Sequence, residues 1–151
     1  MNLENKVIML VEDNQDDEEL TLLALKKNNI NNEVVVARNG IEALDYLFAR
    51  GEYSGRDNKR LPAVILLDLN LPGINGLEVL RQLRGNPETK LLPVVVLTTS
   101  NDRNDIMNSY SLGINSYVIK PVDFNQFVQL ISCLGPYWLV INELPYDIGG
   151  K

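Results

Sequence analysis

The chain has 151 residues, of which 45% are hydrophobic and 23% charged, a composition typical of one folded globular domain rather than a disordered chain or a membrane protein. The net charge of −6 and the lack of a basic run argue against nucleic-acid binding. Because no histidine is present, a Ser-His nucleophile, a histidine zinc site and a phosphohistidine on this chain are excluded.

Two features predict where the protein works. Residues 1–10 lead straight into a strand pattern without a signal peptide, and no apolar run is long enough to span a membrane. We therefore expect a cytoplasmic protein that does not enter the membrane.

Cys133 is the single cysteine, so no internal disulfide can form, and its apolar neighbours predict a buried small hydrophobe rather than a reactive thiol.

Strand and helix patterns alternate in the first half of the chain. The predicted elements are a strand over 6–13, a helix over 15–29, a strand over 33–40 and a helix over 41–51. The first helix has acids in its first turn and lysines in its last, which suits the helix dipole. The second helix is expected to stop at Gly51, and the polar loop that follows is long for a compact domain.

The second half continues the alternation. Its predicted elements are strands over 63–68, 92–100 and 115–121, helices over 76–86 and 101–113, and a last amphipathic helix that opens at Asp123. Strands alternating with helices predict an α/β fold, a doubly wound five-stranded parallel sheet with helices on both faces. Ligands of such folds bind beyond the carboxyl ends of the strands.

The segment after Leu134 is short. We divide the chain into a domain of residues 1–134 and a C-terminal extension of residues 135–151, which is too short for a separate output or DNA-binding domain. Pro136 has no N–H and is expected to break or kink the last helix. Trp138 and Leu139 are candidates for contact with a second copy, the alternative being that they pack on their own domain.

Polar residues stand where four of the predicted strands end. They are Glu12, Asp13, Asp68, Thr98, Thr99, Lys120 and, beside the lysine, Pro121. Taken singly, each has an ordinary explanation as a helix cap, a turn hydroxyl or a solvated lysine. Their coincidence at four strand ends favours one shared site at one edge of the sheet.

The chemistry of this set points to phosphate. Three carboxylates brought together raise one another's pKa unless a cation is present, and Mg²⁺ prefers oxygen ligands. With a metal, the Lys120 ammonium and the Thr98 hydroxyl, Asp68 has what a phosphate-accepting carboxylate needs to hold three phosphoryl oxygens. Asp16 and Asp17 are interpreted as first-turn helix charges, one of them a candidate for contact with a metal-bound water.

Four motifs together resemble the receiver domain of two-component response regulators. They are VEDN at 11–14, LLDLNLPGINGLEVL at 66–80, PVVVLTTS at 93–100 and YVIKP at 117–121, in order and suitably separated. The resemblance runs over most of the chain, from Lys6 to Leu134. It implies a flavodoxin-like sheet with the strand order 2-1-3-4-5.

The resemblance assigns the phosphoacceptor and its metal. Asp68 matches the phosphoacceptor, and Asp13 matches the carboxylate that binds magnesium directly. Glu12 matches the neighbour that acts through water, although many receivers have Asp there and the glutamate lengthens one arm of the pocket. Asn70 matches the position whose backbone carbonyl is a metal ligand.

It also assigns the residues that respond to phosphorylation. Thr98 matches the switch hydroxyl that contacts the phosphoryl group, and Lys120 the lysine that pairs with it. Tyr117 matches the switch aromatic on the fifth strand. Pro121 matches a proline whose preceding bond is usually cis in the family, which would fix the Lys120 backbone.

The implied function is a phosphorylatable switch. A sensor histidine kinase or phosphotransfer protein donates the phosphoryl group, and the chain catalyses only its own phosphorylation and dephosphorylation. The output is a changed protein–protein contact without direct DNA binding. The loop over 50–62 and the tail over 137–145 resemble single-domain regulators that partner bacterial phytochromes and related kinases, which use a C-terminal extension to form homodimers.

Three other functions are compatible with parts of this pattern. A phosphohydrolase with an Asp nucleophile is disfavoured because Asn70 stands where that class has a second Asp. A flavin-binding electron carrier is disfavoured because carboxylates, not a phosphate-cradling loop, follow the first strand. A receiver-like interaction module that is not phosphorylated stays open as the alternative; its sign would be a missing site residue, and none is missing.

Thr99 replaces the small residue, often Ala, that commonly follows the switch hydroxyl in this family. Its extra bulk is expected to shield the phosphoaspartate from water. We therefore expect a Thr99→Ala variant to lose its phosphoryl group faster than the native chain, measured as the decay of the acyl phosphate. An unchanged or slower decay in the variant would contradict this.

Overall fold

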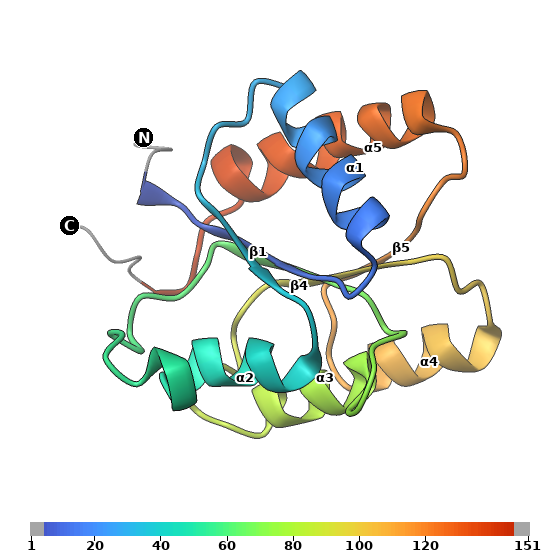
Figure 1. The fold of residues 1–151 in the computed structure, drawn as a ribbon. Helices are drawn as coiled ribbons and strands as arrows, with labels where there is room; N and C mark the ends of the chain where they lie inside the picture. Colours follow the sequence, from blue (N-terminus) through green and yellow to red (C-terminus); the bar gives the residue numbers. More distant parts are fainter. Residues whose placement is uncertain (1–4, 147–151) are drawn as a thin grey trace.

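A computed structural model describes residues 5–146, which form a parallel β-sheet between two layers of helices (Figure 1). The strands are β1 (Ile8–Val11), β2 (Val34–Ala37), β3 (Val64–Leu67), β4 (Val94–Thr98) and β5 (Ser116–Ile119). Their order is 2-1-3-4-5, and all neighbouring strands run parallel. The predicted fold class and strand order are confirmed.

Helices cover both faces of this sheet. They are α1 (Gln15–Lys27), α2 (Gly40–Phe48), α3 (Gly76–Arg84), α4 (Arg103–Ser111), α5 (Phe124–Pro136), the short 3-10 helix η2 (Gly51–Tyr53) and the π-helical turn η3 (Tyr137–Ile141). Helices α1 and α5 lie on one face, and α2, α3 and α4 on the other (Figure 1). Each predicted helix and strand is present, and differences are confined to the ends.

Side chains of the central strands fill a hydrophobic core on each face. In β1, Met9 and Val11 pack towards α2 and α3, whereas Ile8 and Leu10 pack towards α1 and α5. The strands β1, β3 and β4 are buried throughout, because helices cover both of their faces. The edge strands β2 and β5 are partly exposed.

Asparagine residues cap the N-termini of three of the helices. The side-chain oxygens of Asn14, Asn39 and Asn75 each accept a hydrogen bond from the backbone N–H three residues later, at 2.9, 2.7 and 3.0 Å. The end of α2 differs from the expected stop at Gly51. The helix ends at Phe48 because Ala49 takes a left-handed conformation with φ of 53°.

Pro136 changes the type of helix rather than the direction of the chain. The proline lacks an N–H, so one helical hydrogen bond is missing there, but the Tyr137 N–H still donates to the Cys133 carbonyl and Tyr137 keeps helical angles of φ −60° and ψ −53°. The Asn142 N–H then donates to the Tyr137 carbonyl, five residues back, at 2.7 Å. The predicted break is therefore a switch from α5 to η3.

Trp138 and Leu139 belong to the core of their own chain. Their exposed fractions are 8% and 2%, and they pack in the cluster between the sheet and α5. The Lys6 ammonium also donates to the Leu139 carbonyl at 2.7 Å. The structure agrees with the alternative that these two residues pack on their own domain, and the exposed apolar side chains of η3 are Tyr137, Val140 and Ile141.

Cys133 is exposed, so the prediction of a buried cysteine is wrong. The buried positions of α5 are Phe127, Ile131 and Gly135, which recur every four residues and face the sheet. Cys133 lies two residues after Ile131, over half a helical turn away, and therefore faces outwards. Among the residues described, no helix has the length and apolar character needed to cross a bilayer.

Candidate functional site

The register of the parallel strands brings the predicted site residues together. Val11 pairs with Leu67, so the residues that follow them, Glu12 and Asp68, lie side by side. On the other side of the site, the Lys120 N–H continues the β4–β5 ladder by donating to the Thr98 carbonyl at 2.7 Å. Backbone hydrogen bonds of the sheet, rather than loops, therefore set the positions of these side chains.

The Lys120 ammonium lies among three carboxylates. Its Nζ is 2.5 Å from Glu12 Oε1, 3.1 Å from Asp17 Oδ2 and 3.2 Å from Asp68 Oδ2. The side chains of Lys120, Glu12 and Asp68 are less than a tenth exposed, whereas Asp17 is 37% exposed. Charges buried to this degree are tolerated only when they are paired and hydrogen bonded, as these are.

Burial and charge oppose each other in this cluster. Burial raises the pKa of Glu12 to about 7, although the hydrogen bond from Lys120 acts in the opposite direction. Burial alone would lower the pKa of Lys120, but its hydrogen bond to Glu12 and the charge of Asp68 outweigh that effect and raise it. Lys120 therefore stays protonated, and its single positive charge does not fully offset the cost of burying the Glu12 carboxylate. A second cation beside Glu12 would offset the rest.

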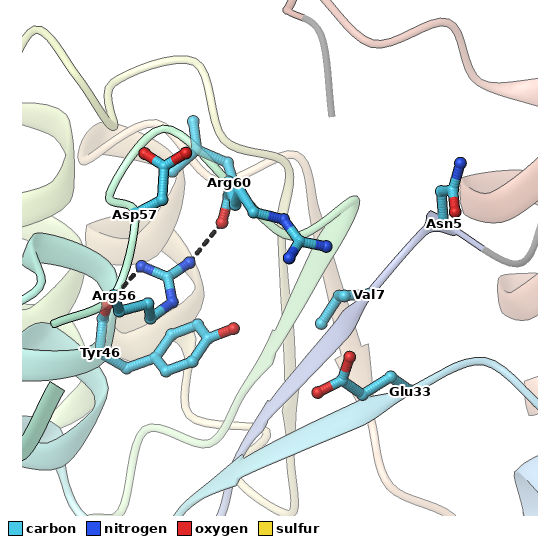
Figure 2. Close-up of a pocket in the computed structure, with 8 residues that line it drawn as sticks. Asn5, Val7, Glu33, Tyr46, Arg56, Asp57 and Arg60 are labelled. Atoms are coloured by element: carbon cyan, nitrogen blue, oxygen red, sulfur yellow. Dashed lines mark hydrogen bonds between the residues drawn. The ribbon is translucent and has the colours of Figure 1, made fainter. Parts of the chain in front are cut away.

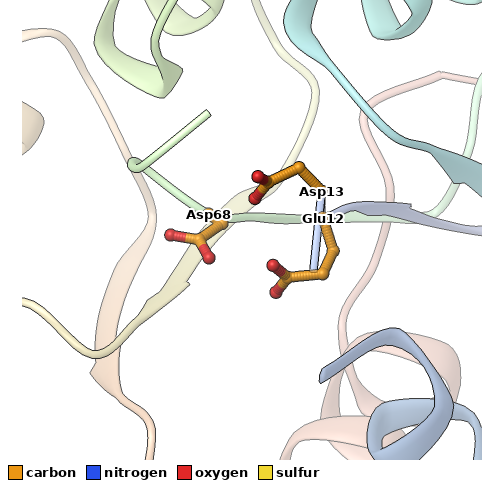
Figure 3. A group of neighbouring side chains, drawn as sticks. All are labelled: Glu12, Asp13 and Asp68. Atoms are coloured by element: carbon orange, nitrogen blue, oxygen red, sulfur yellow. The ribbon is translucent and has the colours of Figure 1, made fainter. Parts of the chain in front are cut away.

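Three carboxylates are placed to supply that cation with ligands. Glu12, Asp13 and Asp68 each offer an oxygen, and these oxygens lie within 4.8 Å of one another (Figure 3). Asp13 is exposed and the other two are buried, so the group opens towards solvent on one side. A donor set of oxygens alone fits a hard divalent cation such as Mg²⁺ or Mn²⁺.

Asn70 lies beside the three carboxylates that could hold a metal, and its backbone orients the Asp68 side chain. Its N–H donates to Asp68 Oδ1 at 3.1 Å, while the other oxygen, Oδ2, contacts Lys120. Both oxygens of the Asp68 carboxylate are therefore oriented. The expected role of the Asn70 carbonyl as a metal ligand stays a prediction.

The end of β4 connects the site to Tyr117. Thr98 is fully buried, and its hydroxyl accepts a long, 3.4 Å hydrogen bond from the Ser100 N–H. The Tyr117 hydroxyl donates to the Ser100 carbonyl at 2.9 Å, and burial raises the pKa of Tyr117. Thr99, by contrast, is exposed at the surface. The loop after Thr98 is thus tied directly to Tyr117, with Ser100 as a link that the sequence did not reveal.

The peptide bond before Pro121 is trans. Residues 5–146 contain no cis peptide bond, so the cis bond implied by the family resemblance is wrong for this structure. Trans is the isomer that bonds before proline prefer, by about 0.5–1 kcal/mol. Lys120 is fixed in another way, through its backbone hydrogen bond to Thr98 and its contacts with the carboxylates.

Asp17 is the site residue that the sequence interpretation assigned to another role. It lies in the first turn of α1, where its N–H donates to the capping oxygen of Asn14 at 2.9 Å. This turn comes shortly after the end of β1, and the Asp17 side chain points back to Lys120. No local signal separates Asp17 from Asp16 in this turn, because the contact with Lys120 depends on the ends of β1 and β5 meeting at one edge of the sheet.

A second hollow lies at the opposite end of the sheet and has a volume of about 310 Å³ (Figure 2). The Arg56 guanidinium lies 3.8 Å from the centre of the Tyr46 ring and donates to the carbonyls of Tyr46 and Arg60. Arg56 therefore braces the long loop before β3. Because Glu33 and Asp57 line the same hollow as the two arginines, it has no uniform charge, unlike the carboxylate cluster.

Comparison with known proteins agrees with this geometry. The response regulator receiver domain family matches residues 8–132. This chain belongs to that family. The receiver domain therefore has its place in two-component signalling.

Its relatives include regulators of similar length. The receiver is 40% identical over 140 residues to response regulator Rcp1 of Synechocystis sp., with 93% of each chain covered. A solved Mn²⁺-bound form of Rcp1 superimposes with a TM-score of 0.84 at 39% identity, covering 93% of this chain and 99% of the other. The structure of the phosphorylated cyanobacterial phytochrome response regulator RcpA superimposes with a TM-score of 0.85 at 42% identity, covering 93% of this chain and 98% of the other. The bacteriophytochrome response regulator AtBRR superimposes with a TM-score of 0.73 at 52% identity, covering 91% of this chain and 98% of the other.

Gly76 allows the first turn of α3 to pass directly behind Asp68. A Cβ there would lie 2.5 Å from the Asp68 carbonyl oxygen and 2.7 Å from the Leu69 Cα, both backbone atoms. We expect Gly76→Ala to lower the free energy of unfolding by about 1–3 kcal/mol, measured by urea denaturation. Gly55→Ala is the control, since nothing lies within 4 Å of a Cβ at that position. Equal effects of the two substitutions would contradict the prediction.

Proposed function

We propose that Asp68 accepts a phosphoryl group from a phosphohistidine of a sensor histidine kinase or a phosphotransfer protein, in a magnesium-dependent reaction. One observation supports this most strongly. The Asp68 carboxylate lies 3.2 Å from the Lys120 ammonium and also belongs to the group of carboxylates that could hold a metal. Relatives described as phytochrome response regulators, one of them solved in phosphorylated form, favour a kinase of the phytochrome class as the donor.

Glu12, Asp13 and Asp68 are the residues that would hold the magnesium ion, together with the Asn70 carbonyl. The Mn²⁺-bound structure of Rcp1 supports a divalent cation in this family, and the all-oxygen donor set suits magnesium. When bound, the ion supplies positive charge that neutralises the phosphoryl oxygens and the carboxylates around them.

The remaining chemistry belongs to the side chains of the chain. An Asp68 oxygen forms a bond to phosphorus as the bond from phosphorus to the donor imidazole nitrogen breaks in line. That nitrogen keeps the electron pair and takes a proton from solvent. The protonated Lys120 binds the phosphoryl oxygens, and the Thr98 hydroxyl donates to another of them. Since little covalent work is required, positioning and charge provide most of the rate.

Phosphorylation then changes a surface. The new charge at Asp68 draws the Thr98 hydroxyl towards it, and the loop that carries Ser100 follows. Tyr117 is hydrogen bonded to this loop at 2.9 Å, so its ring responds to the same movement. The helices α4 and α5 with β5 form the face that changes, through a two-state equilibrium that the phosphoryl group biases. The output is a protein–protein contact rather than direct DNA binding.

The chain is also proposed to form a homodimer through its C-terminal segment, as its resemblance to single-domain regulators implies. Trp138 and Leu139 are buried, so the contact falls to the exposed apolar side chains of η3, which are Tyr137, Val140 and Ile141. The division of the chain at residue 134 and the cytoplasmic location stay predictions.

Intact mass after incubation with acetyl phosphate tests the phosphoacceptor. We expect the native chain to gain one phosphoryl group when Mg²⁺ is present and none after chelation of the metal. The Asp68→Asn variant, which keeps the shape of the side chain without its nucleophile, is expected to gain none. A phosphoryl group retained in Asp68→Asn would refute the assignment. No gain in the native chain, with acetyl phosphate or with a histidine kinase, would favour the interaction module that is not phosphorylated.

Light scattering over a range of protein concentrations tests the dimer. Ile141 is 66% exposed on η3, and Ile41 is 54% exposed on α2. We expect Ile141→Asp to weaken self-association by at least about tenfold, because a carboxylate replaces an apolar side chain at the contact. Ile41→Asp makes the same chemical change elsewhere and is expected to leave association unchanged. Equal effects of both substitutions would rule out η3 as the contact.

A further inference from the structure

Lys120 has one carboxylate partner that does not belong to the three carboxylates that could hold a metal. Its Nζ contacts Glu12, Asp17 and Asp68 at 2.5, 3.1 and 3.2 Å. Glu12 and Asp68 also belong, with Asp13, to the three carboxylates that could share a metal, whereas Asp17 does not. A cation held by that group competes with the Lys120 ammonium for Glu12 and Asp68, and Asp17 is left as the partner that the lysine does not share.

Two hydrogen bonds fix the backbone of Asp17. Its N–H donates to the Asn14 side-chain oxygen at 2.9 Å, and its carbonyl accepts a hydrogen bond from the Thr21 hydroxyl at 2.8 Å. Thr21 is only 1% exposed, so this turn of α1 is anchored in the protein. The Asp17 carboxylate therefore approaches Lys120 from a fixed piece of helix.

We propose that Asp17 is a positioning residue that keeps the Lys120 ammonium beside Asp68 while the metal is bound. It acts through Lys120 and does not contact the phosphoryl group. The proposal rests on the phosphorylation of Asp68 proposed above. It also gives α1 a part in the reaction beyond carrying a charge in its first turn.

Asp16 provides a matched control. It lies beside Asp17 in the same first turn and carries the same charge, but it is exposed and is not a partner of Lys120. A general electrostatic effect of first-turn acids would appear in both alanine variants. An effect transmitted through Lys120 would appear in Asp17→Ala alone.

The test compares Asp17→Ala, Asp17→Asn and Asp16→Ala at saturating acetyl phosphate and Mg²⁺. We expect Asp17→Ala to lower the maximal phosphorylation rate about tenfold, the loss typical of one hydrogen bond between charged groups. The Mg²⁺ dissociation constant is expected to change by less than about twofold, because Asp17 is not a ligand. Asp17→Asn, which keeps an acceptor oxygen, is expected to lie in between, and Asp16→Ala to match the native chain.

A second readout does not depend on the reaction. The ¹⁵N signal of the Lys120 ammonium in the Mg²⁺-loaded protein reports how firmly the group is held. We expect faster proton exchange of this group in Asp17→Ala and native behaviour in Asp16→Ala. Urea denaturation of each variant checks that the fold is retained.

Distinct outcomes overturn the proposal and the function on which it rests. If Asp17→Ala matches Asp16→Ala in rate and in ammonium exchange, Asp17 does not position Lys120. If Mg²⁺ affinity falls as far as the rate, Asp17 acts on the metal instead, and the proposal is wrong. Phosphorylation that persists in Asp68→Asn, measured in the same series, would overturn the proposed function itself, whatever Asp17 does.

Discussion

A nearly buried lysine surrounded by carboxylates is the constraint on which this structure depends. Neither the Lys120 ammonium nor the Glu12 and Asp68 carboxylates would be stable with so little exposure alone, and each is accommodated only by the others. Lys120 comes from the end of β5, an edge strand, and the acids come from the ends of β1 and β3 in the centre. The cluster therefore ties an edge of the sheet to its middle. It remains rich in negative charge, which is why a cation belongs there.

The position of β5 relates this constraint to signalling. The central strands carry the acids and are buried on both faces, so they form a rigid base. The edge strand carries Lys120 and Tyr117 and is partly exposed, so moving it disturbs less of the core. The loop after Thr98 joins the two parts through the hydrogen bond to Tyr117. A change of charge at the central strands can therefore reach the less buried edge strand through this loop.

The sequence was sufficient for the strand pattern and for most of the site, because in a parallel sheet the residues that follow neighbouring strands meet at one edge. Features that depend on contacts between distant segments were missed. First-turn acids suit any helix, so nothing local distinguished Asp17 from Asp16. Trp138 lies seven residues after Ile131, on the buried face of α5 continued into η3, so the expected break at Pro136 concealed its place in the core. The family resemblance implies a cis bond before Pro121, whereas in this structure the bond is trans and the sheet ladder and the carboxylates hold Lys120.

The contact between Lys6 and Leu139 has a consequence for how this fold can be built into larger assemblies. The Lys6 ammonium binds the Leu139 carbonyl just before β1 begins, at the end of the sheet away from the carboxylates. The first strand and the last helical turn are thus fastened together on the side opposite the reactive surface. A module joined near either of these points would start on the side of the domain away from the carboxylate cluster.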